Sequence, residues 1–120
     1  MKMPEPDAGI LARRDWIVRD LRGLVAGDGV IDDPDGLKTY ESDGLTAYRQ
    51  PPMVVVLPET TEEVARVLAY CGAAGIKIVP RGAGTSLSGG ALPLADGVIL
   101  GLAKFNRILD IDLENRCAVV

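Results

Sequence analysis

The sequence contains no histidine among its 120 residues. The side chain that most often serves as a general base is therefore missing. No serine or cysteine has a basic partner at a recognisable spacing, which argues against a hydrolase. The two cysteines, Cys71 and Cys117, are too few for a disulfide framework and lack neighbouring ligands at metal-site spacing. We expect both to be buried, unreactive thiols in a reducing cytoplasm.

Long apolar runs and basic clusters are missing as well. No apolar run reaches the length that a helix needs to span a bilayer, and the first seven residues lack the apolar core of a secretory signal. The net charge of −4 argues against nucleic acid as a partner, because phosphate backbones require a basic face. A chain of 120 residues can bury one modest core and forms one domain or less.

A glycine-rich segment over residues 80–90 is the most informative feature present. Four glycines and three hydroxyl side chains follow directly on the apolar run 76–79. Such a loop can turn several backbone N–H groups toward one point and so bind an anion. No carboxylate lies between Glu63 and Asp96, whereas Arg66, Lys77 and Arg81 are positive. The segment therefore predicts a phosphate or pyrophosphate site, and a purely structural glycine loop is the alternative.

The common nucleotide motifs do not match this loop. A dinucleotide fingerprint that starts at Gly82 needs a glycine where Leu87 stands. A P-loop that starts at Gly84 needs a lysine where Gly90 stands. The loop therefore has a spacing of its own.

Hydrophobic periodicity predicts a mixed α/β chain. The N-terminal part should form a helix over residues 7–25 that ends at Gly27 or Gly29, with Trp16 in a core or docking contact, and a short strand over 30–31. Residues 32–36 have the composition of a turn, and we prefer a solvated turn to a metal site for their acidic cluster. Residues 50–52 form a linker.

A βαβ unit should follow the linker. Residues 53–57 and 76–79 read as parallel strands, joined by a helix that a capping box of Thr60 and Glu63 begins and that Gly72 and Gly75 end. The helix should pack Val64, Val67, Leu68 and Cys71 onto the sheet. Residues 97–102 form a third strand, and 107–113 with 116–120 form a hairpin. Asp110 and Asp112 share a face of that hairpin, which we expect to be solvated rather than catalytic.

Four segments of the chain resemble one known family. Residues 81–93 look like the pyrophosphate loop of the FAD-linked oxidases of the vanillyl-alcohol-oxidase type, whose flavin domain is called PCMH-type. Residues 40–49, 54–58 and 103–111 look like the same group, and the similarity is strongest to flavoprotein subunits of bacterial glycolate oxidases and to D-lactate dehydrogenases. The resemblance implies an α/β (α+β) fold, with residues 1–49 as an N-terminal helix and lead-in segment and 50–120 as the incomplete first lobe of the FAD-binding domain.

The resemblance also implies a function. The chain would hold the FAD pyrophosphate of an FAD-dependent 2-hydroxy-acid dehydrogenase, with glycolate oxidase favoured. A D-lactate dehydrogenase, an alkyl-glycerone-phosphate synthase and a fragment that binds no flavin stably are the alternatives. Relatives that tether FAD through this loop carry a histidine just after the glycines, so Thr85 there implies a non-covalent flavin. The expected cofactor-binding residues are Pro80, Arg81, Gly82, Ala83, Gly84, Thr85, Ser86, Leu87, Gly89 and Gly90.

No catalytic or metal-binding residue is expected within this chain. The sequence stops in an apolar run, so we expect an N-terminal piece of a longer flavoprotein whose substrate-binding groups follow residue 120. The resemblance further implies partner subunits, an iron–sulfur subunit among them. It places the protein in the cytoplasm, with a peripheral contact to the inner membrane through those partners.

Overall fold

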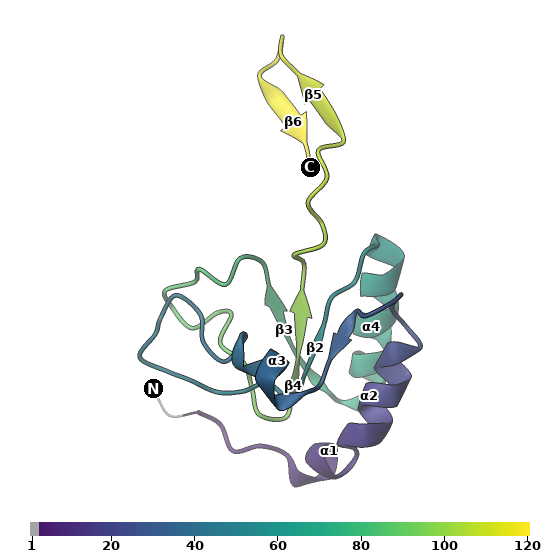
Figure 1. Cartoon of the computed structure of the whole chain (residues 1–120), viewed down its shortest axis with the longest axis vertical. Helices are drawn as coiled ribbons and strands as arrows, with labels where there is room; N and C mark the ends of the chain where they lie inside the picture. Colours follow the sequence, from purple (N-terminus) through teal and green to yellow (C-terminus); the bar gives the residue numbers. More distant parts are fainter. Residues whose placement is uncertain (1–2) are drawn as a thin grey trace.

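A four-stranded sheet lies at the centre of the structure, a computed structural model that describes residues 3–120. Its spatial order is β1 (Val30–Ile31), β2 (Val54–Val56), β4 (Gly97–Gly101) and β3 (Lys77–Arg81). Strands β2, β4 and β3 run parallel, and β1 pairs antiparallel with β2 (Figure 1). The predicted parallel βαβ unit is confirmed. Because β4 lies between β2 and β3, the two strands of that unit are not neighbours.

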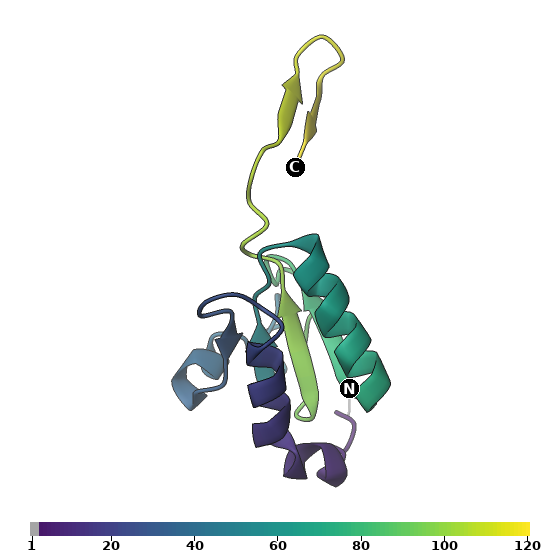
Figure 2. The same ribbon diagram turned by 90° about the vertical axis from the view of Figure 1, so that its right-hand side faces the viewer.

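Both faces of the sheet are covered by helices. Helices α1 (Ala8–Ala12), α2 (Arg14–Arg22) and α4 (Thr61–Ala74) share one core cluster with Val54, Val56 and Val98. Helix α3 (Pro34–Lys38) places Leu37 in a smaller cluster with Val55 and Ile99 (Figure 2). Successive residues of β2 thus enter opposite clusters, as the period of two of a strand requires. The predicted continuous apolar strand is confirmed on both of its faces.

The predicted N-terminal helix is two helices. Arg13 has φ −99° and ψ 8°, outside the helical range, and separates α1 from α2, which ends at Gly23 rather than at Gly27 or Gly29. The Asp7 side chain caps α1, and Ile17 and Leu21 are buried as expected. Trp16 is 62% exposed beneath the Arg19 guanidinium, so it is not a core residue.

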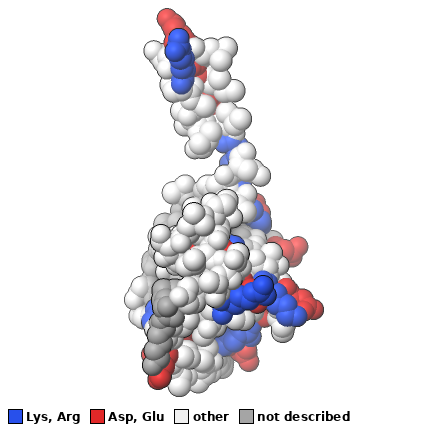
Figure 3. Space-filling view, turned by 90° about the vertical axis from the view of Figure 1, so that its left-hand side faces the viewer, with Lys and Arg blue, Asp and Glu red and all other residues white. Residues whose placement is uncertain are grey.

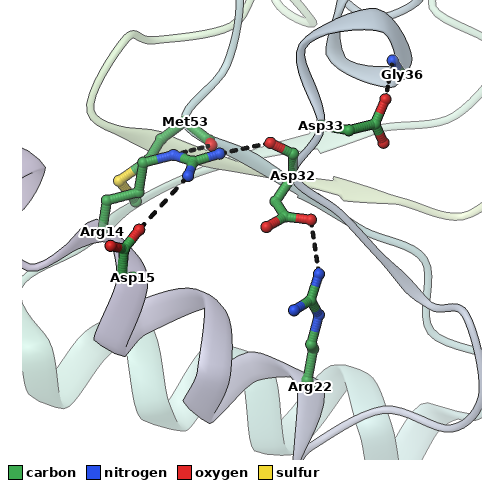
Figure 4. A network of polar contacts seen from close by, with 7 residues as sticks. All are labelled: Arg14, Asp15, Arg22, Asp32, Asp33, Gly36 and Met53. Carbon is green, nitrogen blue, oxygen red and sulfur yellow. Dashed lines mark hydrogen bonds and ion pairs between the residues drawn. The ribbon is translucent and has the colours of Figure 1, made fainter.

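The acidic segment after β1 was expected to be a turn and is a helix start instead. The Asp33 side chain accepts from the Gly36 N–H at 2.7 Å and caps α3, and Pro34 suits the first helical position. Asp32 pairs with Arg22 at 2.6 Å, and its carbonyl accepts from Arg14, which also reaches the Met53 carbonyl (Figure 4). The Asp32 carboxylate thus ties α2 to the segment after β1, and the Asp33 carboxylate begins α3. Among the described residues, no three or more Asp, Glu or Cys side chains lie close enough together to bind a metal ion.

Helix α4 begins much as predicted. Thr60 Oγ1 accepts from the Glu63 N–H at 3.2 Å, but the Glu63 carboxylate reaches past Thr60 to the N–H groups of Glu59 and Ala26. The hydrogen bond from Glu59 is the main reason why the pKa of Glu63 is lowered despite burial. Gly75, with φ 69°, ends the helix, whereas Gly72 lies inside it. Val67 and Cys71 face the core, but Leu68 is 46% exposed, contrary to the prediction.

The predicted hairpin is present and is shorter than expected. Strands β5 (Asp110–Asp112) and β6 (Cys117–Val119) pair antiparallel and stand away from the sheet (Figure 1). Asp110 is exposed and Asp112 accepts from Asn115, which fits a solvated face. Cys117 is exposed, so the expectation of two buried thiols is wrong for it, while Cys71 is buried and burial raises its pKa to about 11. Within the described residues, no helix is long and apolar enough to cross a bilayer.

Candidate functional site

The glycine-rich segment leaves the carboxyl end of β3. Pro80 and Arg81 belong to this strand and pair with Leu100 and Gly101 of β4, so the loop itself covers residues 82–90. The Leu102 N–H donates to the Arg81 carbonyl at 2.9 Å, so the segments that follow β3 and β4 stay side by side as they leave the sheet. The carboxyl edge of parallel strands is where open α/β sheets bind ligands. The predicted position of the loop is therefore confirmed.

Two of the loop glycines have backbone conformations that other residues rarely adopt. Gly84 has φ 72° and Gly89 has φ 76°. These left-handed values are accessible to glycine at little cost. Gly82 and Gly90 lie outside the left-handed region, and a Cβ atom at Gly82 would meet open space.

The Arg81 guanidinium lies directly beneath the loop. Its Nη1 donates to the carbonyls of Ser42 at 2.8 Å and Ala91 at 3.4 Å, and the group lies 5.5 Å from the centre of the Tyr40 ring. A Cβ atom at Gly84 would collide with this guanidinium. Arg81 thus supplies a fixed positive charge against the backbone of Gly84. A side chain at position 84 would have to displace it.

The other two cations of this part of the chain act elsewhere. Lys77, at the start of β3, pairs with the buried Asp96 at 2.7 Å. Arg66 donates to the Leu24 carbonyl at 3.0 Å. Of the three positive residues named in the sequence between Glu63 and Asp96, only Arg81 lies at the loop.

Residues 42–45 support the loop from one side, a contact that the sequence did not predict. A Cβ atom at Gly44 would lie 2.8 Å from the carbonyl oxygens of both Thr85 and Ser86. The backbone of Gly44 is therefore packed against the peptide units of Thr85 and Ser86, which leaves no room for a side chain at position 44. Within residues 3–120, the backbone N–H groups of Ser86 and Leu87 donate no hydrogen bond.

The loop is largely open to solvent. Leu87 is 75% exposed, and Gly82, Ala83 and Thr85 are exposed as well. The Ser86 hydroxyl accepts from the N–H groups of Ser88 and Gly90, at 3.4 and 3.2 Å, and stabilises the turn from within. The face of the molecule on the left of Figure 1 is mainly uncharged, and basic and acidic side chains lie together toward one edge of it (Figure 3). Backbone N–H groups and one partly buried cation, rather than a basic patch, are what this loop offers an anion.

Asp43 stands out among the residues that flank the loop. It is only 5% exposed. Its Oδ1 accepts from the Leu45 N–H at 2.9 Å, whereas its Oδ2 is the one buried side-chain oxygen or nitrogen in residues 3–120 without a hydrogen-bond partner. A buried polar atom without a partner costs free energy, so it needs an explanation.

A separate hollow lies at the same edge of the sheet. It has a volume of about 490 Å³ and is lined by the start of α4 and by the segment that leads to the hairpin, with Lys104, Phe105 and Arg107 among its residues. Lys104 is paired with Glu59 at 2.6 Å. None of the predicted site residues lines this hollow.

The loop has the features that a pyrophosphate requires. N–H groups without partners at Ser86 and Leu87, the Arg81 guanidinium against Gly84 and glycines with room for close approach are features that suit an anion. All ten predicted residues lie within residues 80–90, with Pro80 and Arg81 in the strand and the rest in the loop. The residues present thus fit the phosphate part of a dinucleotide.

Comparison with known proteins identifies the family. Residues 52–120, more than half of the chain, match the model of a family described as FAD binding domain. The chain is 46% identical to the glycolate oxidase subunit GlcD of Escherichia coli (strain K12) over 107 residues, which are 89% of this chain and 21% of that protein. It is 35% identical to the mitochondrial D-2-hydroxyglutarate dehydrogenase of Arabidopsis thaliana over 89 residues, 74% of this chain and 16% of that protein.

A solved structure agrees with the sequence comparisons. The structure of p-cresol methylhydroxylase with substrate bound superposes with a TM-score of 0.67 at 26% identity, over 93% of this chain and 22% of that one. The expected PCMH-type fold is confirmed. The chain spans about a fifth of the length of the relatives that it matches. This chain belongs to the FAD binding domain family, and FAD is the cofactor of that family.

Proposed function

We propose that residues 82–90 bind the pyrophosphate of FAD, as part of an oxidoreductase that acts on the CH–OH group of 2-hydroxy acids. The observation that carries the proposal is the pair of backbone N–H groups at Ser86 and Leu87, which have no hydrogen-bond partner within residues 3–120, in a loop whose Gly84 packs on the Arg81 guanidinium. Residues 50–120 would form the first lobe of the flavin domain, with 1–49 leading into it. Glycolate is the favoured substrate of the whole protein, because the GlcD similarity covers most of this chain.

The residues of this chain would bind and orient the cofactor. The Ser86 and Leu87 N–H groups would donate to phosphate oxygens, and the glycines would allow the phosphates to approach the backbone. Arg81 would offset their negative charge from beneath. Bound FAD supplies the redox chemistry, by accepting a hydride equivalent from the substrate. The absence of histidine supports non-covalent binding.

The remaining parts of the proposal concern the whole protein. We infer partner subunits, an iron–sulfur subunit among them, from the similarity to a subunit of glycolate oxidase. A cytoplasmic protein with a peripheral contact to the inner membrane is consistent with such an assembly. A D-lactate dehydrogenase, or another FAD-linked oxidase of the family, is the nearest alternative and would share the same loop.

A second candidate is a chain that holds no flavin stably. The exposure of the loop favours it, because a ligand bound there would be covered by this chain on one side only. A direct binding experiment separates the two functions.

Gly84→Ala tests the proposal against a matched glycine variant. The new Cβ would collide with the Arg81 guanidinium at a left-handed φ, whereas Gly72→Ala adds the same methyl group to open space on α4. Equilibrium dialysis against FAD should show binding by the wild type and by Gly72→Ala. Loss of two hydrogen bonds to charged phosphates, each contributing about 1.5–3 kcal/mol, should weaken binding by Gly84→Ala about 100-fold or more. Equal FAD binding by both variants would refute the role of the loop.

A further inference from the structure

Asp43 is buried in a way that its own fold does not explain. Its Oδ1 accepts from the Leu45 N–H and forms a local turn, which needs one oxygen. The second oxygen, Oδ2, has no partner within residues 3–120 although the side chain is 5% exposed. No Lys or Arg in that part of the chain makes an ion pair with it; the Arg81 guanidinium donates to the neighbouring Ser42 carbonyl instead. A turn of this kind would form equally well with an uncharged amide.

The neighbours of Asp43 place it beside the candidate loop. The residue before it, Ser42, holds the Arg81 side chain through its carbonyl, at 2.8 Å. The residue after it, Gly44, lies against the carbonyl oxygens of Thr85 and Ser86. Both chain neighbours of Asp43 therefore contact the loop or the cation beneath it.

The chemistry of a carboxylate limits what this oxygen can recognise. An ionised carboxylate only accepts hydrogen bonds. A phosphate has no proton to donate near neutral pH and repels a second negative charge. The hydroxyl groups of a dinucleotide are neutral donors that lie within a few bonds of its phosphates. A hydroxyl is therefore the part of the ligand that Asp43 suits.

We propose that Asp43 is a second binding group of this site, whose Oδ2 accepts a hydrogen bond from a sugar-chain hydroxyl of the dinucleotide. The proposal rests on the proposed function of the loop. It assigns the loop to the phosphates and the buried carboxylate to the hydroxyl-bearing chain beside them. The two sources of such a hydroxyl are the ribityl chain next to the flavin ring and the ribose next to adenine.

Asp43→Asn tests the proposal by the sign of its effect. Asparagine keeps the oxygen that accepts from Leu45, so the thermal stability should stay close to that of the wild type. FAD affinity, measured by equilibrium dialysis, should fall about fivefold or more, because a charge-assisted hydrogen bond is lost. If Asp43 only repels the phosphates, the same variant should bind FAD more tightly. Asp15→Asn is the control, since it removes the same charge from a side chain that is 96% exposed.

Smaller ligands distinguish the source of the hydroxyl. A loss of affinity for FAD and FMN but not ADP assigns the ribityl chain, and a loss for FAD and ADP but not FMN assigns the ribose. Inorganic pyrophosphate has no hydroxyl-bearing chain, so its affinity should not fall. An equal loss for all four ligands would mean that Asp43 only supports the loop, and unchanged or tighter FAD binding would overturn the proposal as well. Absence of FAD binding by the wild type would instead refute the proposed function, and this inference with it.

Discussion

Gly44 and Gly84 constrain the candidate loop from two sides. At Gly44 the backbone of residues 42–45 packs against the carbonyls of Thr85 and Ser86, and at Gly84 the loop packs onto Arg81. Each glycine is required for a different reason. Gly44 leaves room for another stretch of backbone, whereas Gly84 also has a φ of 72° that other residues rarely adopt.

The two cysteines should differ sharply in reactivity. Burial raises the pKa of Cys71 to about 11, so its thiol stays protonated and shielded at about pH 8, whereas Cys117 is exposed on β6. We predict that a thiol-specific reagent labels one cysteine rapidly in the native protein and both in denaturant. Cys117→Ser should abolish the rapid phase. Rapid labelling of both thiols in the native state would contradict the packing of α4 on the sheet.

Among the elements, the unit of β2, α4 and β3 was the most predictable. Its apolar strands, the Thr60 cap and the left-handed Gly75 are local signals, and each corresponds to a feature of the structure. Helix α3 could not be predicted in the same way, because five residues are too few for a periodic pattern. The break between α1 and α2 at Arg13 could not be predicted either, because no glycine or proline stands at that position. The order of β3 and β4 depends on contacts between distant parts of the chain.

Asp96 joins three parts of the fold just before β4. It accepts from Lys77 of β3 at 2.7 Å and from the Asp7 N–H at 2.8 Å, next to α1. Burial raises the pKa of Asp96, but these hydrogen bonds lower it by more, so the net shift is downward. The stabilisation is therefore present above the unfolded value of 3.8 and is lost as the pH falls through the lower folded value.

Asp96→Asn should thus destabilise the protein in a pH-dependent way. Loss of the charged partner of Lys77 should reduce the free energy of unfolding by about 1–3 kcal/mol near neutral pH. Urea titrations should show a constant difference from the wild type above about pH 5, and a smaller one as the pH falls below the ordinary value of the carboxyl group. Asp35→Asn, at an exposed side chain, should show no comparable loss. A difference that grows in acid would contradict this account.

For the molecule as a whole, the sequence predicted the position of the loop better than the contacts that support it. Four glycines after an apolar strand indicated an anion site, and the loop lies at the carboxyl edge of the sheet as expected. The support from residues 42–45 was not predicted, because it joins segments about 40 positions apart and only Gly44 hints at it. The sequence also could not tell which of the two cations lies at the loop. Arg81 does, whereas Lys77 is paired with Asp96.

The hairpin and the segment before it give the molecule an exposed apolar surface. Ile108, Leu109, Ile111 and Leu113 are 58–85% exposed. A two-stranded hairpin of this kind is marginally stable by itself in water. The sheet and its loop, by contrast, rest on two buried clusters, so the candidate site belongs to the well-packed part of the structure.

The most direct test of the central claim is a ¹H–¹⁵N NMR titration of the chain with FAD. We predict that the amide signals of residues 82–90 shift, with Ser86 and Leu87 among the largest changes, because their N–H groups have no hydrogen-bond partner within residues 3–120. Inorganic pyrophosphate should shift the same signals and compete with FAD. Shifts confined to the hollow beside Lys104 and Arg107, or no shifts in the loop at saturating FAD, would contradict the account.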